Sequence, residues 1–399
     1  MCKERANSMK WIAKSRIITL LGLWLALASF LLAQAARKPA SFPPAPKTVP
    51  KAGTAKSTAG ARPAVSEAAV RDKIIRFVRA RFGVPDNVTI TSEPLTPSIH
   101  PRFLQTVIVT DNGKEKHNNN VLITRDNRLL VIGSLVKVDK DPQSEVVPRL
   151  RQQFKIPDTV NLTATPFHAS TFPELEVTSV TVEDPRGKQS QDFYLTKDRQ
   201  CLVLGSVYNL AVDPQKHALQ TLNTMNSPST GSRAAPVTIV EFADLQCASC
   251  SRMHDFLEND ILRKYGEKVR VVYKDFPLPS IHDWTLTATI ANQCVYQINP
   301  SAYVPFRSMV FKNQASINAA NVRDLVLSYG EQLGVDRLRL AACVDAKSTL
   351  PRIEESVKEG QAVGVQATPT SFINGKMVVG LPTSDAYFKD IDEALRAAK

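Results

Sequence analysis

Two cysteines with two residues between them, Cys247 and Cys250 in the stretch EFADLQCASCSRM, have the clearest chemical potential in this sequence. They follow the apolar, β-like run VTIVEF and open an amphipathic segment that is typical of a helix. Such a pair can form half of a zinc site, close a small structural loop, or exchange disulfides.

The placement of the pair favours redox chemistry. Zinc needs two further ligands, and the nearest candidates, His254 and His282, do not form a second pair of ligands. A disulfide between residues three apart closes a very short loop and gains little unfolded-state entropy. The N-terminus of a helix, in contrast, offers free N–H groups and partial positive charge that stabilise a thiolate. We therefore expect a redox pair and no bound metal.

The elements around the pair predict an α/β thioredoxin fold for residues 237–399, with a helical insertion over about residues 284–346. The chain alternates strand, helix and strand, continues with helices, and closes with a hairpin and a final helix capped by Ser384. The hairpin is predicted by Asn374-Gly375, a favourable two-residue turn.

Four motifs in this region carry a family resemblance: VTIVEFADLQCASC, VRVVYKDFPLPSIH, ANQC and GVQATPTSFINGK. In this order they resemble the DsbA-like thiol:disulfide oxidoreductases, and in particular the BdbD-type subgroup. The resemblance covers about Ala234 to Lys399 and does not extend to the N-terminal region.

The resemblance implies roles for individual residues. Cys247 corresponds to the attacking cysteine and Cys250 to its partner. Glu241 corresponds to the acid beneath the pair that helps proton transfer; the alternative is a charged residue at a strand end. Thr368 and Pro369 correspond to a loop whose cis proline faces the disulfide and leaves backbone groups free for an extended substrate.

Two further features follow from the resemblance. Cys294 and Cys343 lie at the two ends of the helical insertion, where several relatives have cysteines, so a structural disulfide is implied; buried free thiols are the alternative. The intervening residues, Ala248 and Ser249, differ from the Pro-His or Pro-aromatic pair that is usual in oxidising members. Because Ser249 supplies no charge, we expect a moderately lowered Cys247 pKa, and the direction of electron flow stays open.

The implied function is an exported oxidoreductase that exchanges disulfides with protein thiols through a mixed disulfide, without a cofactor and with a membrane redox partner. Two alternatives remain. One is a disulfide isomerase or reductase that is dimerised by the N-terminal domain. The other is a non-catalytic binding protein or chaperone that keeps the fold.

The N-terminus predicts export. A basic segment, an apolar run and the small residues Ala33-Gln34-Ala35 form the three-part pattern of a signal peptide over residues 1–35, which would remove Cys2. This indicates a periplasmic or other extracytoplasmic location. Membrane anchoring through residues 17–33 is the alternative. Residues 36–66 are rich in Pro, Ala and Lys and are expected to form a linker.

An internal repeat with an offset of 72 residues precedes the redox region. RFGVPDNVTIT at 81–91 returns as QFKIPDTVNLT at 153–163, and LITRDNRLLVIGSLVKVDKDP at 122–142 returns at 194–214. Each copy begins with a helical pattern and continues with about three strands. This predicts an α+β domain of two units side by side, 67–142 and 143–222, followed by a linker at 223–236.

The repeat region contains no clustered catalytic residues. Its histidines, His100, His117 and His168, do not recur at the 72-residue offset. Cys201 aligns with Leu129 of the first copy, which indicates a small apolar residue on a strand; an intermolecular disulfide is the alternative.

The net charge of +12 does not indicate nucleic-acid binding. Residues 1–66 carry +10 of it, which leaves +2 for residues 67–399. The folded part is therefore nearly neutral, and no basic stripe for phosphate is expected.

Overall fold

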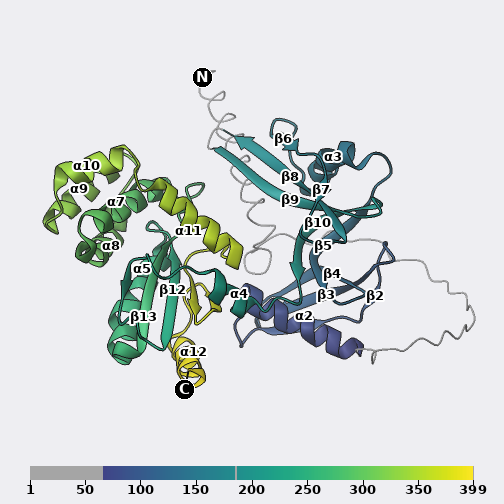
Figure 1. Ribbon diagram of the computed structural model, residues 1–399, viewed down its shortest axis with the longest axis horizontal. Coiled ribbons are helices and arrows are strands. Elements are labelled where there is room, and N and C mark those ends of the chain that lie inside the picture. The colour runs from purple at the N-terminus through teal and green to yellow at the C-terminus, as the bar shows by residue number, and fades with distance from the viewer. Residues whose placement is uncertain (1–65, 185–186, 399) are drawn as a thin grey trace, which may run out of the picture.

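The computed structural model describes residues 66–184 and 187–398. The expected signal peptide, Cys2 and the expected linker up to residue 65 lie outside these residues. Two lobes lie side by side in Figure 1: one dominated by a long twisted sheet, the other by a smaller sheet with helices around it. Among the described residues, no helix is both long and apolar enough to cross a bilayer.

The first lobe contains one ten-stranded sheet and two helices. The first half comprises α2 (Glu67–Phe82), β1 (Thr89–Ser92), β2 (Thr96–Pro97), β3 (Phe103–Asp111), β4 (Lys116–Thr124) and β5 (Leu129–Lys137). The second half comprises α3 (Pro142–Phe154), β6 (Asn161–Ala164), β7 (His168–Ala169), β8 (Leu175–Asp184), β9 (Gly187–Thr196) and β10 (Cys201–Asn209). Each half therefore has three long strands, as the sequence predicts. Each half also has two strands of two to four residues, which are too short to be predicted from the sequence pattern.

The strand pairings of the two halves follow the 72-residue offset. Thr89 pairs with Asp111 in the first half, and Asn161 pairs with Glu183 in the second. The halves join through β5 and β10, which are antiparallel with Gly133 opposite Gly205. A Cβ at Gly133 would lie 2.2 Å from the Leu204 carbonyl oxygen, so glycine permits this close approach. The two units thus share one continuous sheet. The sequence predicts only that they pack side by side, whereas in the structure backbone hydrogen bonds join them.

Each helix of this lobe covers its own half of the sheet. Val70, Ile74, Phe77 and Val78 form an apolar stripe at helical spacing on α2 and pack on the first half. Val146 of α3 belongs to a separate apolar cluster on the second half. The lobe therefore has one apolar cluster under each helix, and a third cluster, which includes Leu129 and Val203, joins the two halves.

Helix α4 (Pro214–Thr221) connects the lobes. The segment 223–236, predicted as a linker, is not a separate tether: Ser229–Thr230 forms β11, which pairs with the edge of the second sheet. The Arg270 side chain also donates to the Thr224 carbonyl at 2.9 Å. The Ser- and Pro-rich composition suggested a linker, but an edge strand of two residues needs only backbone hydrogen bonds.

The second sheet has the strand order β11-β13-β12-β14-β15, with β12 parallel to β13. Its remaining strands are β12 (Val237–Ala243), β13 (Val269–Asp275), β14 (Thr370–Ile373) and β15 (Lys376–Val379). Strands β12 and β13 are buried along almost their whole length because helices cover both faces. The turn between β14 and β15 has positive φ at Asn374 and Gly375, as its sequence predicts.

Helices account for the rest of this lobe. They are α5 (Ala248–Phe256), a π-helical turn (Leu257–Ile261), α6 (Leu262–Tyr265), α7 (Thr285–Ile298), α8 (Tyr303–Lys312), α9 (Val322–Gln332), α10 (Arg337–Asp345), α11 (Leu350–Val363) and α12 (Ser384–Ala397), with short 3₁₀ turns at Gly266–Lys268, Pro300–Ala302 and Gln314–Ser316. Helices α7 to α10 form the predicted insertion, at the upper left of Figure 1. The prediction that Ser384 caps α12 is wrong by one residue: the Thr383 hydroxyl accepts from the Ala386 N–H.

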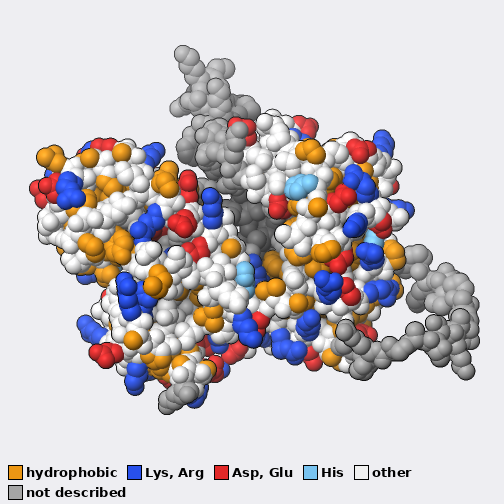
Figure 2. Space-filling view, in the orientation of Figure 1, with side chains coloured by type: hydrophobic (Ala, Val, Ile, Leu, Met, Phe, Trp, Pro, Cys, Tyr) orange, Lys and Arg blue, Asp and Glu red, His pale blue; other side chains and the backbone are white. Residues whose placement is uncertain are grey.

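Charges of both signs are mixed on the visible face of the molecule. On the face shown in Figure 2, Lys and Arg side chains alternate with Asp and Glu over both lobes. This agrees with the near-neutral charge of residues 67–399.

Candidate active site

The two cysteines lie where the central strand β12 passes into α5. Cys247 is the N-cap residue, with an extended backbone, and its carbonyl accepts from the Cys250 N–H at 3.0 Å. Cys250 lies one turn into the helix. Cys247 is half-buried, whereas Cys250 has no exposed surface, and both are thiols in this structure. Only Cys247 can therefore meet a substrate directly.

The surroundings separate the acidities of the two thiols. The pKa of Cys247 falls to about 6, chiefly through a hydrogen bond from the Cys250 side chain, while partial burial opposes the change. The backbone N–H groups of Cys250 and Ser249 at the helix N-terminus also lower it. Burial raises the pKa of Cys250 well above its ordinary value. Near neutral pH, Cys247 is thus a thiolate and Cys250 a thiol.

Asp244, which the sequence reading did not single out, holds the loop before Cys247. Its buried carboxylate accepts from the Gln246 N–H at 2.7 Å, the Leu278 N–H at 2.7 Å and the Thr285 hydroxyl at 2.6 Å. The His282 Nδ1 lies 2.9 Å from the same carboxylate. Asp244 therefore ties the active-site loop to the segment between β13 and α7.

The residues do not assemble a metal site. His282 contacts Asp244, and His254 Nε2 lies 2.7 Å from the Ser308 hydroxyl. Burial lowers the pKa of His254 to about 3, so it is neutral. Within residues 66–184 and 187–398, no group of three or more His, Cys, Asp or Glu side chains could hold a metal ion.

The Thr368–Pro369 peptide bond is cis, and this loop faces Cys247. The Cys247 Sγ lies 3.4 Å from the Thr368 carbonyl oxygen. The nearby Thr368 side chain also lowers the pKa of Cys247. Residues more than 120 positions apart in sequence thus meet at the reactive sulfur.

Glu241 lies on β12 with no exposed surface and pairs with Arg307 of α8, whose Nη2 is 2.8 Å from Glu241 Oε2. The other carboxylate oxygen, Oε1, has no partner among the described residues. Burial raises the pKa of Glu241 and Arg307 opposes this; negative charge on Cys247 raises it further. Glu241 and the thiols are therefore electrostatically coupled.

Arg307 is a site residue that the sequence reading missed. The centres of the Tyr273 and Phe311 rings lie 5.2 and 5.1 Å from its guanidinium carbon. The available signal was a single charge within the apolar run YVPFRSMVF. An arginine inside such a run indicates a buried ion pair, but does not say with which acid.

Ser249 is half-buried beside the pair, and its hydroxyl accepts from Arg252 Nη2 at 3.1 Å. Ser249 itself carries no charge. Its contact with Arg252 nevertheless brings a guanidinium next to one of the two residues between the cysteines.

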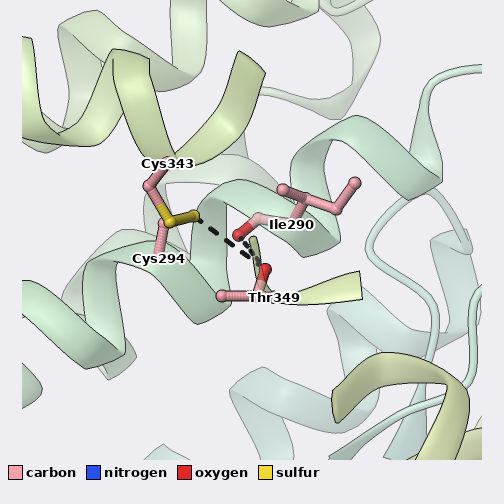
Figure 3. The surroundings of a disulfide bond; sticks show 4 residues. All are labelled: Ile290, Cys294, Cys343 and Thr349. Atoms are coloured by element: carbon pink, nitrogen blue, oxygen red, sulfur yellow. Dashed lines mark hydrogen bonds between the residues drawn. A yellow bond between two sulfur atoms is a disulfide. The ribbon is translucent and has the colours of Figure 1, made fainter. Parts of the chain in front are cut away.

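Cys294 of α7 and Cys343 of α10 form a disulfide, with Cα atoms 6.0 Å apart (Figure 3). Thr349 lies beside it and donates to the Ile290 carbonyl at 3.2 Å. The bridge joins two helices of the insertion and packs in the same apolar cluster as Cys250.

The other candidates of the repeat region belong to the first lobe. Cys201 is a buried thiol on β10 whose N–H donates to the Thr196 hydroxyl, as the aligned Leu129 donates to Thr124. His100 is buried with Nε2 2.8 Å from Asp198 Oδ2. Neither residue belongs to the cluster around Cys247.

The family model described as Thioredoxin matches residues 223–393. The match covers most of the C-terminal domain, which is therefore similar to the thioredoxin family. The thioredoxin fold predicted from sequence is thereby confirmed, and the match begins inside the segment that contains β11.

Two curated proteins illustrate the similarity of the C-terminal domain to known sequences. The disulfide bond formation protein D of Bacillus subtilis is 23% identical over 174 residues, which cover 42% of this chain and 77% of the relative. The Na⁺/H⁺ antiporter NhaA of Herminiimonas arsenicoxydans is 27% identical over 150 residues, or 38% of this chain and 22% of the antiporter. This chain therefore spans about a fifth of the antiporter's length. The resemblance to the BdbD-type proteins that the motifs predict is confirmed.

Solved structures are similar over the same part of the chain. The oxidised BdbD of Bacillus subtilis is 21% identical with a TM-score of 0.41, covering 44% of this chain and 95% of that chain. The α-DsbA1 of Wolbachia pipientis is 22% identical with a TM-score of 0.41, covering 46% and 97%.

Proposed function

We propose that this protein is an extracytoplasmic thiol:disulfide oxidoreductase that acts on protein substrates. The observation that carries the proposal is the acidity difference between an accessible Cys247, with a pKa of about 6, and a fully buried Cys250. A stable thiolate that solvent can reach, backed by a protected thiol, is the arrangement that disulfide exchange needs. The signal-peptide pattern of residues 1–35 supports the location.

The exchange proceeds in two steps when the protein acts as an oxidant. A substrate thiolate attacks the Cys247 sulfur of the Cys247–Cys250 disulfide; the S–S bond breaks, and Cys250 leaves as a thiolate that takes up a proton. A second substrate thiolate then attacks the substrate sulfur of the mixed disulfide and releases the Cys247 thiolate. The substrate dithiol is oxidised to a disulfide and the protein pair is reduced. Reoxidation needs an external disulfide or quinone-linked membrane oxidant.

Neighbouring residues support these steps. Glu241 is coupled to both thiols and has one unpartnered oxygen, so it can take up or return the Cys250 proton. The Thr368–Pro369 loop lies against Cys247 and offers backbone groups for an extended substrate segment.

The test uses the purified protein with an unfolded substrate that contains disulfides. Cys247→Ser should abolish exchange, and Cys250→Ser should accumulate mixed disulfides because the resolving thiol is missing. Wild-type rates in Cys247→Ser would disprove the site. Failure of the wild-type protein to reduce protein disulfides or to oxidise protein dithiols would favour a non-catalytic binding protein.

A disulfide isomerase or reductase is the second candidate, and Ser249 is the observation that favours it. Without a charged residue between the cysteines, the pair is expected to be less oxidising than in the strongest oxidants. Refolding of a substrate with scrambled disulfides separates the two activities. Size-exclusion chromatography tests whether the N-terminal domain forms a dimer.

A further inference from the structure

The N-terminal domain contacts the thioredoxin domain at the end of α2, close to α11. Arg81 Nη1 donates to the carbonyl of Val363, the last residue of α11, at 3.0 Å. The Tyr208 ring of the same N-terminal domain stacks near this guanidinium, 5.3 Å from its carbon. Figure 1 shows α2 and α4 beside the lower end of α11.

Gly364, the left-handed C-cap of α11, leaves open the space that this guanidinium fills. Gly364 has φ +100°, and a Cβ there would lie 1.2 Å from Arg81 Nη1. Arg81 thus occupies the space that any side chain at Gly364 would need. A guanidinium at this place also satisfies a free carbonyl at the helix C-terminus and interacts favourably with the negative end of the helix dipole.

The segment held by Arg81 leads directly to the reactive sulfur. After Gly364, the buried Val365 donates its N–H to the Gly360 carbonyl at 2.8 Å, and the chain reaches Thr368 three residues later. Thr368 places its carbonyl oxygen 3.4 Å from Cys247 Sγ. A second contact lies nearby, because Gly83, the C-cap of α2, packs against Met377 and Val379 of β15.

We propose that Arg81 is a positioning residue for the active site. Its hydrogen bond to the end of α11 fixes the 364–369 loop, so that Thr368 stays in contact with Cys247. The N-terminal domain then has a role in the chemistry of the thioredoxin domain. It sets the reactivity of a cysteine that it does not touch.

The proposal rests on the proposed thiol–disulfide chemistry and predicts a direction. When the loop is released, the Thr368 hydroxyl no longer stays beside the sulfur. The Cys247 thiolate then loses the stabilisation that the nearby Thr368 side chain provides, its pKa rises, and the disulfide becomes less oxidising.

The experiment measures the Cys247 pKa by thiolate absorbance and the glutathione equilibrium of the Cys247–Cys250 pair in the full chain. Arg81→Ala should raise the pKa by about half a unit, which corresponds to about a threefold shift of the equilibrium toward the protein disulfide. Arg81→Lys, which keeps the charge but not the planar fork, should show a smaller shift. Asp86→Asn is the matched control, since it removes the exposed Asp86–Lys389 ion pair at the same interface without touching α11.

A double-mutant cycle distinguishes positioning from general loss of structure. With Thr368→Val in place, Arg81→Ala should cause no further change in the Cys247 pKa. The proposal is overturned if folded Arg81→Ala keeps the wild-type pKa, if Asp86→Asn shifts it equally, or if the two effects simply add. If Arg81→Ala does not fold, an unchanged pKa in Arg81→Lys overturns it. Absence of any glutathione exchange in the wild-type protein would instead disprove the proposed function.

Discussion

Arg307 Nη2 lies 2.8 Å from Glu241 Oε2, and both side chains are almost completely removed from solvent beneath the cysteine pair. Their pairing favours the ionised form of Glu241 although the side chain is buried. Burial alone would drive Glu241 to its neutral form, and Arg307 opposes that shift in its pKa.

Arg307→Met should therefore destabilise the protein by about 3 kcal/mol or more, because it leaves a buried acid without its counter-ion. The measurement is urea unfolding of the oxidised protein. Combining Arg307→Met with Glu241→Gln should recover part of the loss, since neither charge then remains. A single variant as stable as the wild type would show that the pair contributes nothing.

The pH dependence of Cys247 alkylation should follow its lowered pKa. Only the thiolate reacts, so the rate should rise with pH, reach half of its maximum near pH 6 and level off about one unit higher. Cys250→Ala should move the midpoint upward, because the Cys250 side chain is the largest cause of the lowered pKa. A midpoint near that of an ordinary thiol in the wild type would contradict the site geometry.

Ser249→His should make the pair more oxidising. A histidine adds positive charge where Ser249 provides only a hydroxyl that accepts from Arg252. Each unit by which the Cys247 pKa falls corresponds to about a tenfold shift in the glutathione equilibrium toward the reduced protein. Ser249→Ala serves as the control for loss of the hydroxyl. The reasoning fails if the wild type already matches the strongest oxidants or if histidine changes neither quantity.

The Cys294–Cys343 disulfide should survive conditions that reduce the active-site pair, and its removal should affect stability more than exchange. The bridge spans 49 residues of sequence, and closing such a loop contributes about 4 kcal/mol in the chain-entropy model. We expect the Cys294→Ala/Cys343→Ala variant to melt at a lower temperature while its exchange rate at low temperature stays near wild type. Peptide mapping without reduction checks the pairing itself: two free thiols in exported protein would refute it.

Local interactions made several features predictable from sequence. The run VTIVEF followed by CASC specifies a buried strand that passes into a helix, and this alone places Cys247 at a helix N-terminus. Asn374-Gly375 specifies its turn because both residues tolerate positive φ. The two halves of the N-terminal sheet have the same strand pairings because their sequences repeat at an offset of 72 residues.

Contacts between distant segments were decided only by the tertiary structure. Nothing in the sequence near Glu241 indicates that its partner is Arg307. Nor does the sequence indicate that Asp244 accepts hydrogen bonds from Leu278 and Thr285. A buried polar group must find a partner, but packing chooses which one. The same holds for Arg81: its sequence neighbourhood predicts an ordinary helix end, and only the docking of two domains brings it to Val363, within a few residues of the loop that faces Cys247.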